Sequence, residues 1–203
     1  MTTIDTETTP WTQVYKRLVE IVQPRAIAFV SSINAQGQMN LAPFSFYTVV
    51  SCNPPYVAFC PQLAGRTGES KDTLRNVQET KEFVIATVTE ELAEKANACS
   101  ANFPYGESEF THCGLTPLPA QRIKAALVKE SPVNMECELV EIHSYGTSGG
   151  AGNLIVGKVL LLHIAPELYD TEGNIPPDRI RTVARMGGNY WTRSQDIFTL
   201  ERP

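Results

Sequence analysis

Two long β-rich runs in the C-terminal half of the chain limit the fold more than any other feature. They are Asn134–Ile142 and Asn153–Ile164, and the glycine-rich segment Gly146–Gly152 separates them. Two extended runs joined in this way predict a long antiparallel hairpin. The glycine segment does not match a dinucleotide-binding motif, because it lacks the G-x-G-x-x-G spacing and precedes a strand instead of a helix.

Shorter patterns predict the rest of the fold. Strands are expected at Ala26–Ser32, from Met39 onwards, at Tyr56–Cys60 and at Phe83–Val88. Helices are expected at Trp11–Val22, from Ser70 to about Thr80 and from Thr89 to about Ala98, with Ser70 and Thr89 as caps. Six or so strands with only short helices between them predict a mainly β fold, an antiparallel barrel or sandwich.

Length and charge exclude several classes of protein. With 203 residues the chain is expected to form one domain over residues 11–203, preceded by a flexible lead, residues 1–10. A net charge of −5 and the lack of a basic stripe argue against nucleic-acid binding. The sequence has no apolar run of about 18 residues and no secretion signal, so we expect a cytoplasmic protein that does not enter a membrane.

Cysteine and histidine do not suggest a metal site. The five cysteines form no C-x-x-C pair, so reduced and mostly buried thiols are expected. The three histidines are scattered along the chain. We therefore expect no metal ligands.

The segment Asn40–Thr48, with the sequence NLAPFSFYT, is the first candidate ligand site. It places small, hydroxyl and aromatic residues together just after a strand and a turn. One interpretation is a buried edge strand that Pro43 interrupts. The other is a ring-binding segment, in which backbone N–H groups and the hydroxyls of Ser45 and Thr48 bind the polar edge of a ring while Phe46 or Tyr47 packs beside it.

Lys71-Asp72-Thr73, at a predicted helix start, is the second candidate. An ordinary charged first turn would explain it. Alternatively, Lys71 neutralises a phosphate, Thr73 donates its hydroxyl, Asp72 supports the helix start and Arg66 adds a cation from the preceding loop. A ring site and a phosphate site in one small domain suggest a phosphorylated aromatic cofactor.

Short motifs along nearly the whole chain give it a family likeness. They are Pro24–Ala28, Asn40–Phe46, Pro54-Pro55, Lys71–Asn76, Glu82–Val84, Asn97–Ser100, Glu109-Phe110, Gly114–Thr116, Glu136-Cys137 and Ala184–Tyr190. In this combination the chain resembles the flavin reductase-like family of FMN-binding split-barrel proteins. The resemblance implies a homodimeric, six-stranded antiparallel Greek-key barrel with short flanking helices, which holds FMN noncovalently near the subunit interface.

The resemblance also assigns roles to residues. The cofactor-binding residues that it implies, together with the patterns above, are Asn40, Leu41, Ala42, Pro43, Ser45, Phe46, Tyr47, Thr48, Arg66, Lys71, Asp72, Thr73, Asn97, Ala98, Cys99 and Ser100. The implied activity is an NAD(P)H:flavin oxidoreductase, with NAD(P)H as electron donor and a flavin-dependent monooxygenase or another protein as acceptor. A noncatalytic FMN carrier or redox sensor with the same pocket is the alternative.

Arg185 and Tyr190 are the candidate catalytic residues. Arg185 would attract an anionic nicotinamide cofactor or stabilise reduced flavin, and Tyr190 would stack. Alternatively, Arg185 only holds a C-terminal turn through hydrogen bonds to carbonyl groups.

The long connection Ser100–Pro119 is expected to be functional or interfacial. It carries Phe103, Tyr105, Phe110 and Leu115, which would be an apolar liability in water. A second subunit that covers them would make the protein an isologous dimer.

Overall fold

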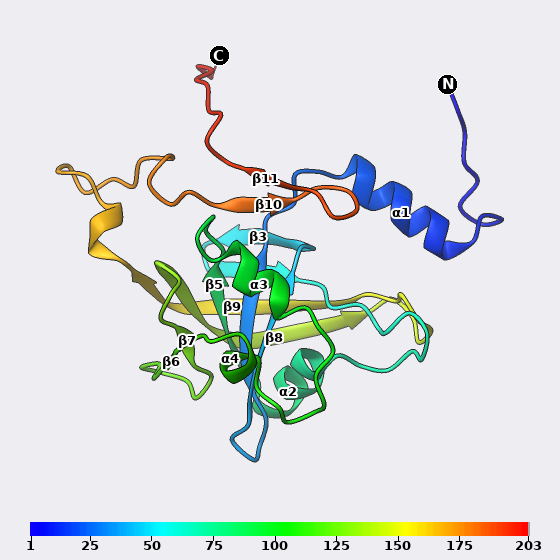
Figure 1. Cartoon of the computed structure of the whole chain (residues 1–203), viewed down its shortest axis with the longest axis horizontal. Coiled ribbons are helices and arrows are strands. Elements are labelled where there is room, and N and C mark those ends of the chain that lie inside the picture. The colour runs from blue at the N-terminus through cyan, green and yellow to red at the C-terminus, as the bar shows by residue number, and fades with distance from the viewer. Residues whose placement is uncertain (203) are drawn as a thin grey trace.

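A seven-stranded antiparallel sheet dominates the computed structural model, which describes residues 1–202 (Figure 1). Its strands are β1 Ala28–Ile33, β2 Met39–Phe44, β3 Tyr47–Cys52, β4 Pro55–Phe59, β5 Glu82–Thr87, β8 Val133–Ser144 and β9 Asn153–Ile164. They follow the order β2-β1-β5-β8-β9-β4-β3. Two small sheets pair β6 Pro117–Leu118 with β7 Leu127–Val128, and β10 Val183–Arg185 with β11 Trp191–Arg193.

The connection between β2 and β3 forces this sheet to curl. The two strands lie at opposite edges of the sheet, but only Ser45 and Phe46 separate them in the chain. Such a connection reaches roughly 11 Å, because consecutive Cα atoms are about 3.8 Å apart. The rings of Phe44 on β2 and Phe59 on β4 accordingly have centroids only 5.3 Å apart.

The mainly β, antiparallel prediction is confirmed, whereas the exact six-stranded barrel is not. Seven strands form the curled sheet, and within residues 1–202 no ladder joins β2 to β3. The predicted segment Asn40–Thr48 breaks at Ser45-Phe46, and its two halves join different edges. The segment that the sequence analysis treats as one unit therefore belongs to two strands, β2 and β3.

The strands β1 and β5 of the curled sheet are buried on both faces. Inside the curl, Val30, Phe59, Phe83 and Ile155 form one cluster with side chains of α2. Outside it, Phe29 of β1 packs in a second cluster that the chain after β5 covers. Alternation along β1 therefore divides its side chains between two cores, which explains why this strand is almost continuously buried.

Five short helical elements flank the sheet. They are α1 Trp11–Ile21, α2 Asp72–Thr80, α3 Ala93–Ala98, α4 Glu109–His112 and a 3₁₀ turn, Pro166–Leu168. The first helix is confirmed, but Ser70 and Thr89 are not caps. The cap of α2 is Lys71, and α3 begins four residues after Thr89, which pairs with Thr182 in an isolated β-bridge instead.

The 100–119 connection packs on its own subunit. Phe110 and Leu115 are buried in the outer core cluster, and the ring of Phe103 stacks on His112 with centroids 4.5 Å apart. The Tyr105 hydroxyl lies 3.4 Å from the side-chain oxygen of Asn76. Phe110 and Leu115 therefore do not need a second subunit to cover them, whereas Tyr105 is 49% exposed, and a dimer through this loop stays a prediction.

The cysteines, the helices and the N-terminal lead of the described residues can each be compared with the sequence predictions. All five cysteines are free. No helix within residues 1–202 has the length and apolar character needed to cross a bilayer. The lead, residues 1–10, contains one turn, and its flexibility stays a prediction, as does the single-domain boundary. Pro203, the last residue of the predicted domain, lies outside the described residues.

A buried carboxylate holds the segment before β7 against the sheet. Glu136 of β8 has no exposed surface, and it accepts hydrogen bonds from the backbone N–H groups of Gln121 and Arg122, both at 2.8 Å, and contacts His163 Nε2 at 2.6 Å. Burial alone would raise the pKa of Glu136, but these hydrogen bonds lower it below its usual value.

We predict that Glu136→Gln lowers the free energy of unfolding at neutral pH by about 2 kcal/mol, because an amide cannot accept both backbone hydrogen bonds as a carboxylate does. Since the folded pKa is depressed, the wild-type contribution is present above the unfolded pKa of about 4.3 and is lost as pH falls through the folded value. Urea unfolding at several pH values measures this. Glu138→Gln, at an exposed position of the same strand, is the control; equal stability of the two variants would contradict the prediction.

Candidate ligand pocket

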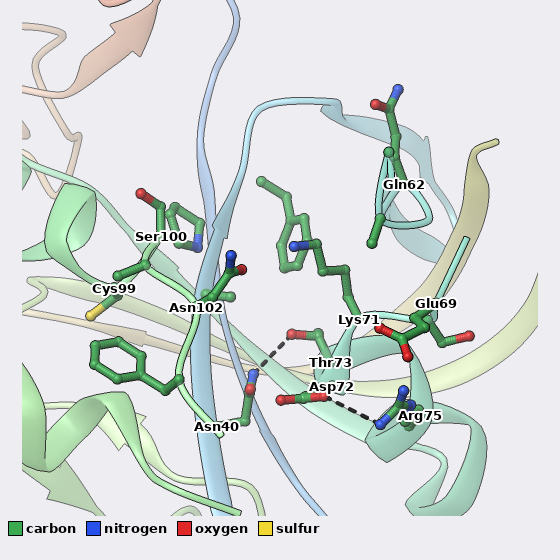
Figure 2. A pocket seen from close by; sticks show the side chains of 18 of the residues that line it. Asn40, Gln62, Glu69, Lys71, Asp72, Thr73, Arg75, Cys99, Ser100 and Asn102 are labelled. Carbon is green, nitrogen blue, oxygen red and sulfur yellow. Dashed lines mark hydrogen bonds and ion pairs between the residues drawn. The ribbon is translucent and has the colours of Figure 1, made fainter. Parts of the chain in front are cut away.

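A cavity of about 860 Å³, seen from close by in Figure 2, is lined in part by the Ser45-Phe46 junction. Its walls are built by β2 with the junction, by the loop from β4 into the start of α2, and by the loop after α3. The helices α1 and α4 add Tyr15 and Glu109. The sheet curl brings these stretches together although they are far apart in the sequence.

Eleven of the predicted ligand residues line this cavity. They are Asn40, Ala42, Pro43, Ser45 and Phe46 from β2 and the junction, Arg66, Lys71, Asp72 and Thr73 from the loop and α2, and Cys99 and Ser100 after α3. The two segments singled out for a ring and for a phosphate thus face one shared space.

The N-terminus of α2 offers an anion site at one end of the cavity. Its cap, Lys71, makes no side-chain capping hydrogen bond within the described chain, so the first amides of the helix keep donors for a ligand. Figure 2 shows Lys71 extending from the start of α2 into the pocket. Asn40 Nδ2 donates to Thr73 Oγ1 at 2.9 Å, which fixes β2 against this helix.

Carboxylates balance part of the positive charge. Asp72 lies 3.7 Å from Arg75, and burial raises the pKa of Asp72 although Arg75 and Lys71 oppose this. Glu109 is buried, its carboxylate accepts the Leu41 N–H at 2.7 Å, and burial raises its pKa as well. Arg66 and Lys71 form no ion pair among residues 1–202, so they are the cations available to an anionic ligand.

The two pocket thiols are not activated nucleophiles. Burial raises the pKa of Cys60 and, more strongly, that of Cys99, where the neighbouring Cys113 adds to the shift. Both thiols therefore stay protonated at neutral pH, and covalent catalysis by thiolate is not supported.

Five predicted ligand residues are not among those that line the cavity in the described chain. The Leu41 side chain is in the outer core and its N–H is taken by Glu109. The Tyr47 phenol packs against the inner core, where burial raises its pKa to about 12, and Thr48 is exposed. Asn97 and Ala98 belong to the end of α3, one residue before the pocket lining.

The predicted catalytic residues lie in the β10–β11 hairpin, outside this pocket. Arg185 Nη2 donates to the Gly188 carbonyl at 2.6 Å, and the guanidinium lies 5.0 Å from the centroid of the Trp191 ring. The hydrogen bond to Gly188 agrees with the alternative in which Arg185 only holds the C-terminal turn. Tyr190 is 77% exposed. Catalytic roles for both stay predictions.

Arg25 connects that hairpin to the pocket. Its Nη1 donates to the carbonyls of Val19 and Val22 at 2.6 and 2.7 Å, and its Nη2 donates to the carbonyl of Met186 at 2.9 Å. The Nε group lies 3.4 Å from Ser45 Oγ in the junction. One buried guanidinium thus ties α1, the C-terminal hairpin and the pocket wall together.

Sequence reasoning missed several lining residues, including Tyr15, Cys60, Gln62, Arg75, Asn102, Tyr105 and Glu109. The length of the 100–119 connection was a usable signal for Asn102 and Tyr105, since both lie in it shortly after Ser100. No local pattern marks Tyr15 or Gln62, because only the curl of the sheet brings them to the cavity.

This donor set fits a flat, phosphorylated ligand. The cavity has a cationic helix start at one end and aromatic side chains, Tyr15, Phe44 and Phe46, in its walls. Its volume lies in the range of pockets that enclose a cofactor-sized molecule. The fold and the pocket therefore define a curled antiparallel β-sheet protein with a cavity of cofactor size beside a cationic helix start.

Comparison with known proteins identifies the family. The model of the flavin reductase like domain matches residues 23–179, and the chain belongs to this family. An uncharacterized protein of Bacillus subtilis is 36% identical over 193 residues, which cover 93% of both chains.

Solved structures agree with this assignment. Nitrilotriacetate monooxygenase component B from Bacillus cereus matches with a TM-score of 0.92 and 33% identity, over 98% of each chain. The 2-nitrobenzoate 2-nitroreductase of Pseudomonas fluorescens matches with a TM-score of 0.88 and 28% identity, over 100% of this chain and 96% of that one.

Proposed function

We propose that the protein is an FMN-dependent oxidoreductase, an NAD(P)H:flavin reductase. The observation that carries the proposal is the pocket, which joins the uncapped N-terminus of α2 and Lys71 to a cavity walled by the β2–β3 junction. Family membership supports flavin chemistry for this pocket.

The residues divide the binding of FMN between the two ends of the cavity. Lys71, Thr73, Arg66 and the first amides of α2 would hold the phosphate, with Asp72 supporting the helix start. The lining residues from Asn40 to Phe46 would hold the ribityl chain and ring, while Leu41, Tyr47 and Thr48 support them from neighbouring positions of the chain. Cys99 and Ser100 would close the other wall, supported by Asn97 and Ala98.

The chain itself needs no acid or base for the reaction. Bound FMN supplies hydride acceptance and release. The side chains of the pocket orient the ligand, exclude water and place donors near its polar edge. A role of the side chains in binding alone agrees with the raised pKa values of Cys60 and Cys99, which keep both pocket thiols protonated.

A monooxygenase is the partner class that we propose as acceptor. The support is the similarity to a monooxygenase component B, a name that states a multicomponent system for that protein. Such a reductase would act in the cytoplasm, where NAD(P)H is available.

We predict that anaerobic addition of NADH or NADPH bleaches the FMN-loaded protein within seconds, and stopped-flow absorbance measures the rate for each donor. Arg185→Ala should retain FMN but slow the reduction, if the hairpin guides the donor. Flavin that stays oxidised with both donors would instead support the noncatalytic carrier, which the position of Arg185 and Tyr190 outside the pocket favours.

We predict that Lys71→Ala weakens FMN binding roughly ten- to a hundredfold, because one charge-assisted contact contributes about 1.5–3 kcal/mol. Riboflavin, which lacks the phosphate, should bind nearly as before. Quenching of flavin fluorescence measures both constants, and Lys158→Ala, at an exposed position of β9, is the control. Equal weakening of both ligands would remove Lys71 from the phosphate site.

We further propose a homodimer, now on a different surface. The apolar side chains Leu18, Ile21 and Val22 of α1 and its C-cap, and Val49 and Val50 of the edge strand β3, are 49–71% exposed. Exposed apolar groups on a helix and on an unpaired edge are typical of an interface. Light scattering should therefore give twice the mass of 22.4 kDa; a monomer that still binds one FMN would contradict it.

A further inference from the structure

The glycine-rich turn between β8 and β9 does more than connect the two strands, because it also contacts a wall of the pocket. It runs along the loop between β4 and α2, which forms one wall of the pocket (Figure 1). The Asn153 N–H donates to the Pro61 carbonyl at 2.9 Å, the Leu63 N–H to Ala151 at 2.9 Å, and the Gly150 N–H back to Leu63 at 3.0 Å. The pocket wall is thus paired, residue by residue, to the hairpin.

The pairing ends in a contact that only glycine permits. A Cβ at position 149 would lie 2.4 Å from the Gly65 carbonyl oxygen, far inside van der Waals contact. The turn therefore sits directly against the backbone of Gly65, one residue before the pocket cation Arg66.

Trp11 covers this contact from the other side. A Cβ at Gly150 would lie 2.6 Å from the Trp11 ring, and one at Gly65 would lie 3.3 Å from it. The indole of α1 thus packs across both glycines and holds the wall between the helix and the hairpin turn. We call Trp11, Gly65, Gly149 and Gly150 the glycine clamp.

The clamp sets where Arg66 can lie. The tip of the loop is closed by hydrogen bonds from Ala64 N–H to Glu69 at 2.9 Å and from Gly68 N–H to Ala64 at 2.8 Å. Because these bonds make the tip a compact unit, a displacement of Gly65 carries Arg66 with it. The unit leads directly into Lys71 and the start of α2.

We propose that the glycine clamp is a positioning element for the phosphate end of the pocket, and that it determines the preference of the protein for phosphorylated over unphosphorylated flavin. The proposal rests on the proposed function for the identity of the ligand. Three of the four clamp residues act through the wall, because Trp11, Gly149 and Gly150 are not among the residues that line the pocket in the described chain, whereas Gly65 is.

Two glycines with nearly equal φ angles provide a matched test. Gly150 has φ +85° and faces Trp11, whereas Gly173 has φ +83° and a Cβ there would meet nothing within 4 Å among the described atoms. Alanine meets the strain of a positive φ at both sites, but only Gly150→Ala must move the indole. Circular dichroism melting of each variant establishes that both are folded, and Trp11→Phe and Trp11→Ala probe the clamp from the other side.

Flavin fluorescence quenching with FMN and with riboflavin is the first readout. Gly150→Ala and Trp11→Ala should weaken FMN about tenfold, the size of one lost charge-assisted contact, and riboflavin less than twofold. Gly173→Ala should leave both constants unchanged, and Trp11→Phe should restore most of the FMN affinity. Equal constants for the two glycine variants, or equal losses for the two ligands, would overturn the proposal.

Limited trypsin digestion is a readout that needs no flavin. Cleavage after Arg66 should be several-fold faster in Trp11→Ala than in wild type, because the tip loses its cover, and unchanged in Gly173→Ala. If wild type binds neither flavin, the proposed function fails and the preference for phosphate fails with it, while the digestion still reports whether Trp11 holds the wall. Equal cleavage rates in wild type and Trp11→Ala would overturn the clamp itself.

Discussion

The two-residue connection between β2 and β3 is the constraint on which the rest of the structure depends. Ser45 and Phe46 join the opposite edges of a seven-stranded sheet, so the sheet has to curl around the inner core. The same curl brings the start of α2, the loop after α3 and Tyr15 of α1 to one cavity. The curl of the sheet and the pocket thus have the same structural cause, because the junction that bends the sheet is also part of the pocket wall.

Local patterns predicted the elements that local chemistry determines. The hairpin β8–β9, helix α1 and the charged start of α2 each follow from a run of residues with the expected periodicity or charge. Lys71 and Thr73 could be found for the same reason, since a helix start is a local feature and its preference for anions is general. The family resemblance added the FMN hypothesis, which no periodicity contains.

The errors came from interactions between distant segments. Thr89 looks like a cap, but its backbone is held by Thr182, more than ninety residues later. Phe110 and Leu115 look like a liability in a long loop, but the outer core buries them. Glu109 carries no local mark of its role, which is to satisfy the Leu41 N–H on the unpaired side of β2. Each of these partners becomes visible only once the sheet has curled.

The surroundings of Arg25 explain why that position demands an arginine although no anion is there. Four oxygens receive its donors, three of them main-chain carbonyls and one a hydroxyl, and no carboxylate pairs with it in the described part of the chain. A lysine has three donors on a single nitrogen, so it could not reach oxygens on α1, the C-terminal hairpin and the junction at the same time. The planar shape of the guanidinium, more than its charge, therefore allows this one residue to connect α1 and the C-terminal hairpin to the pocket wall.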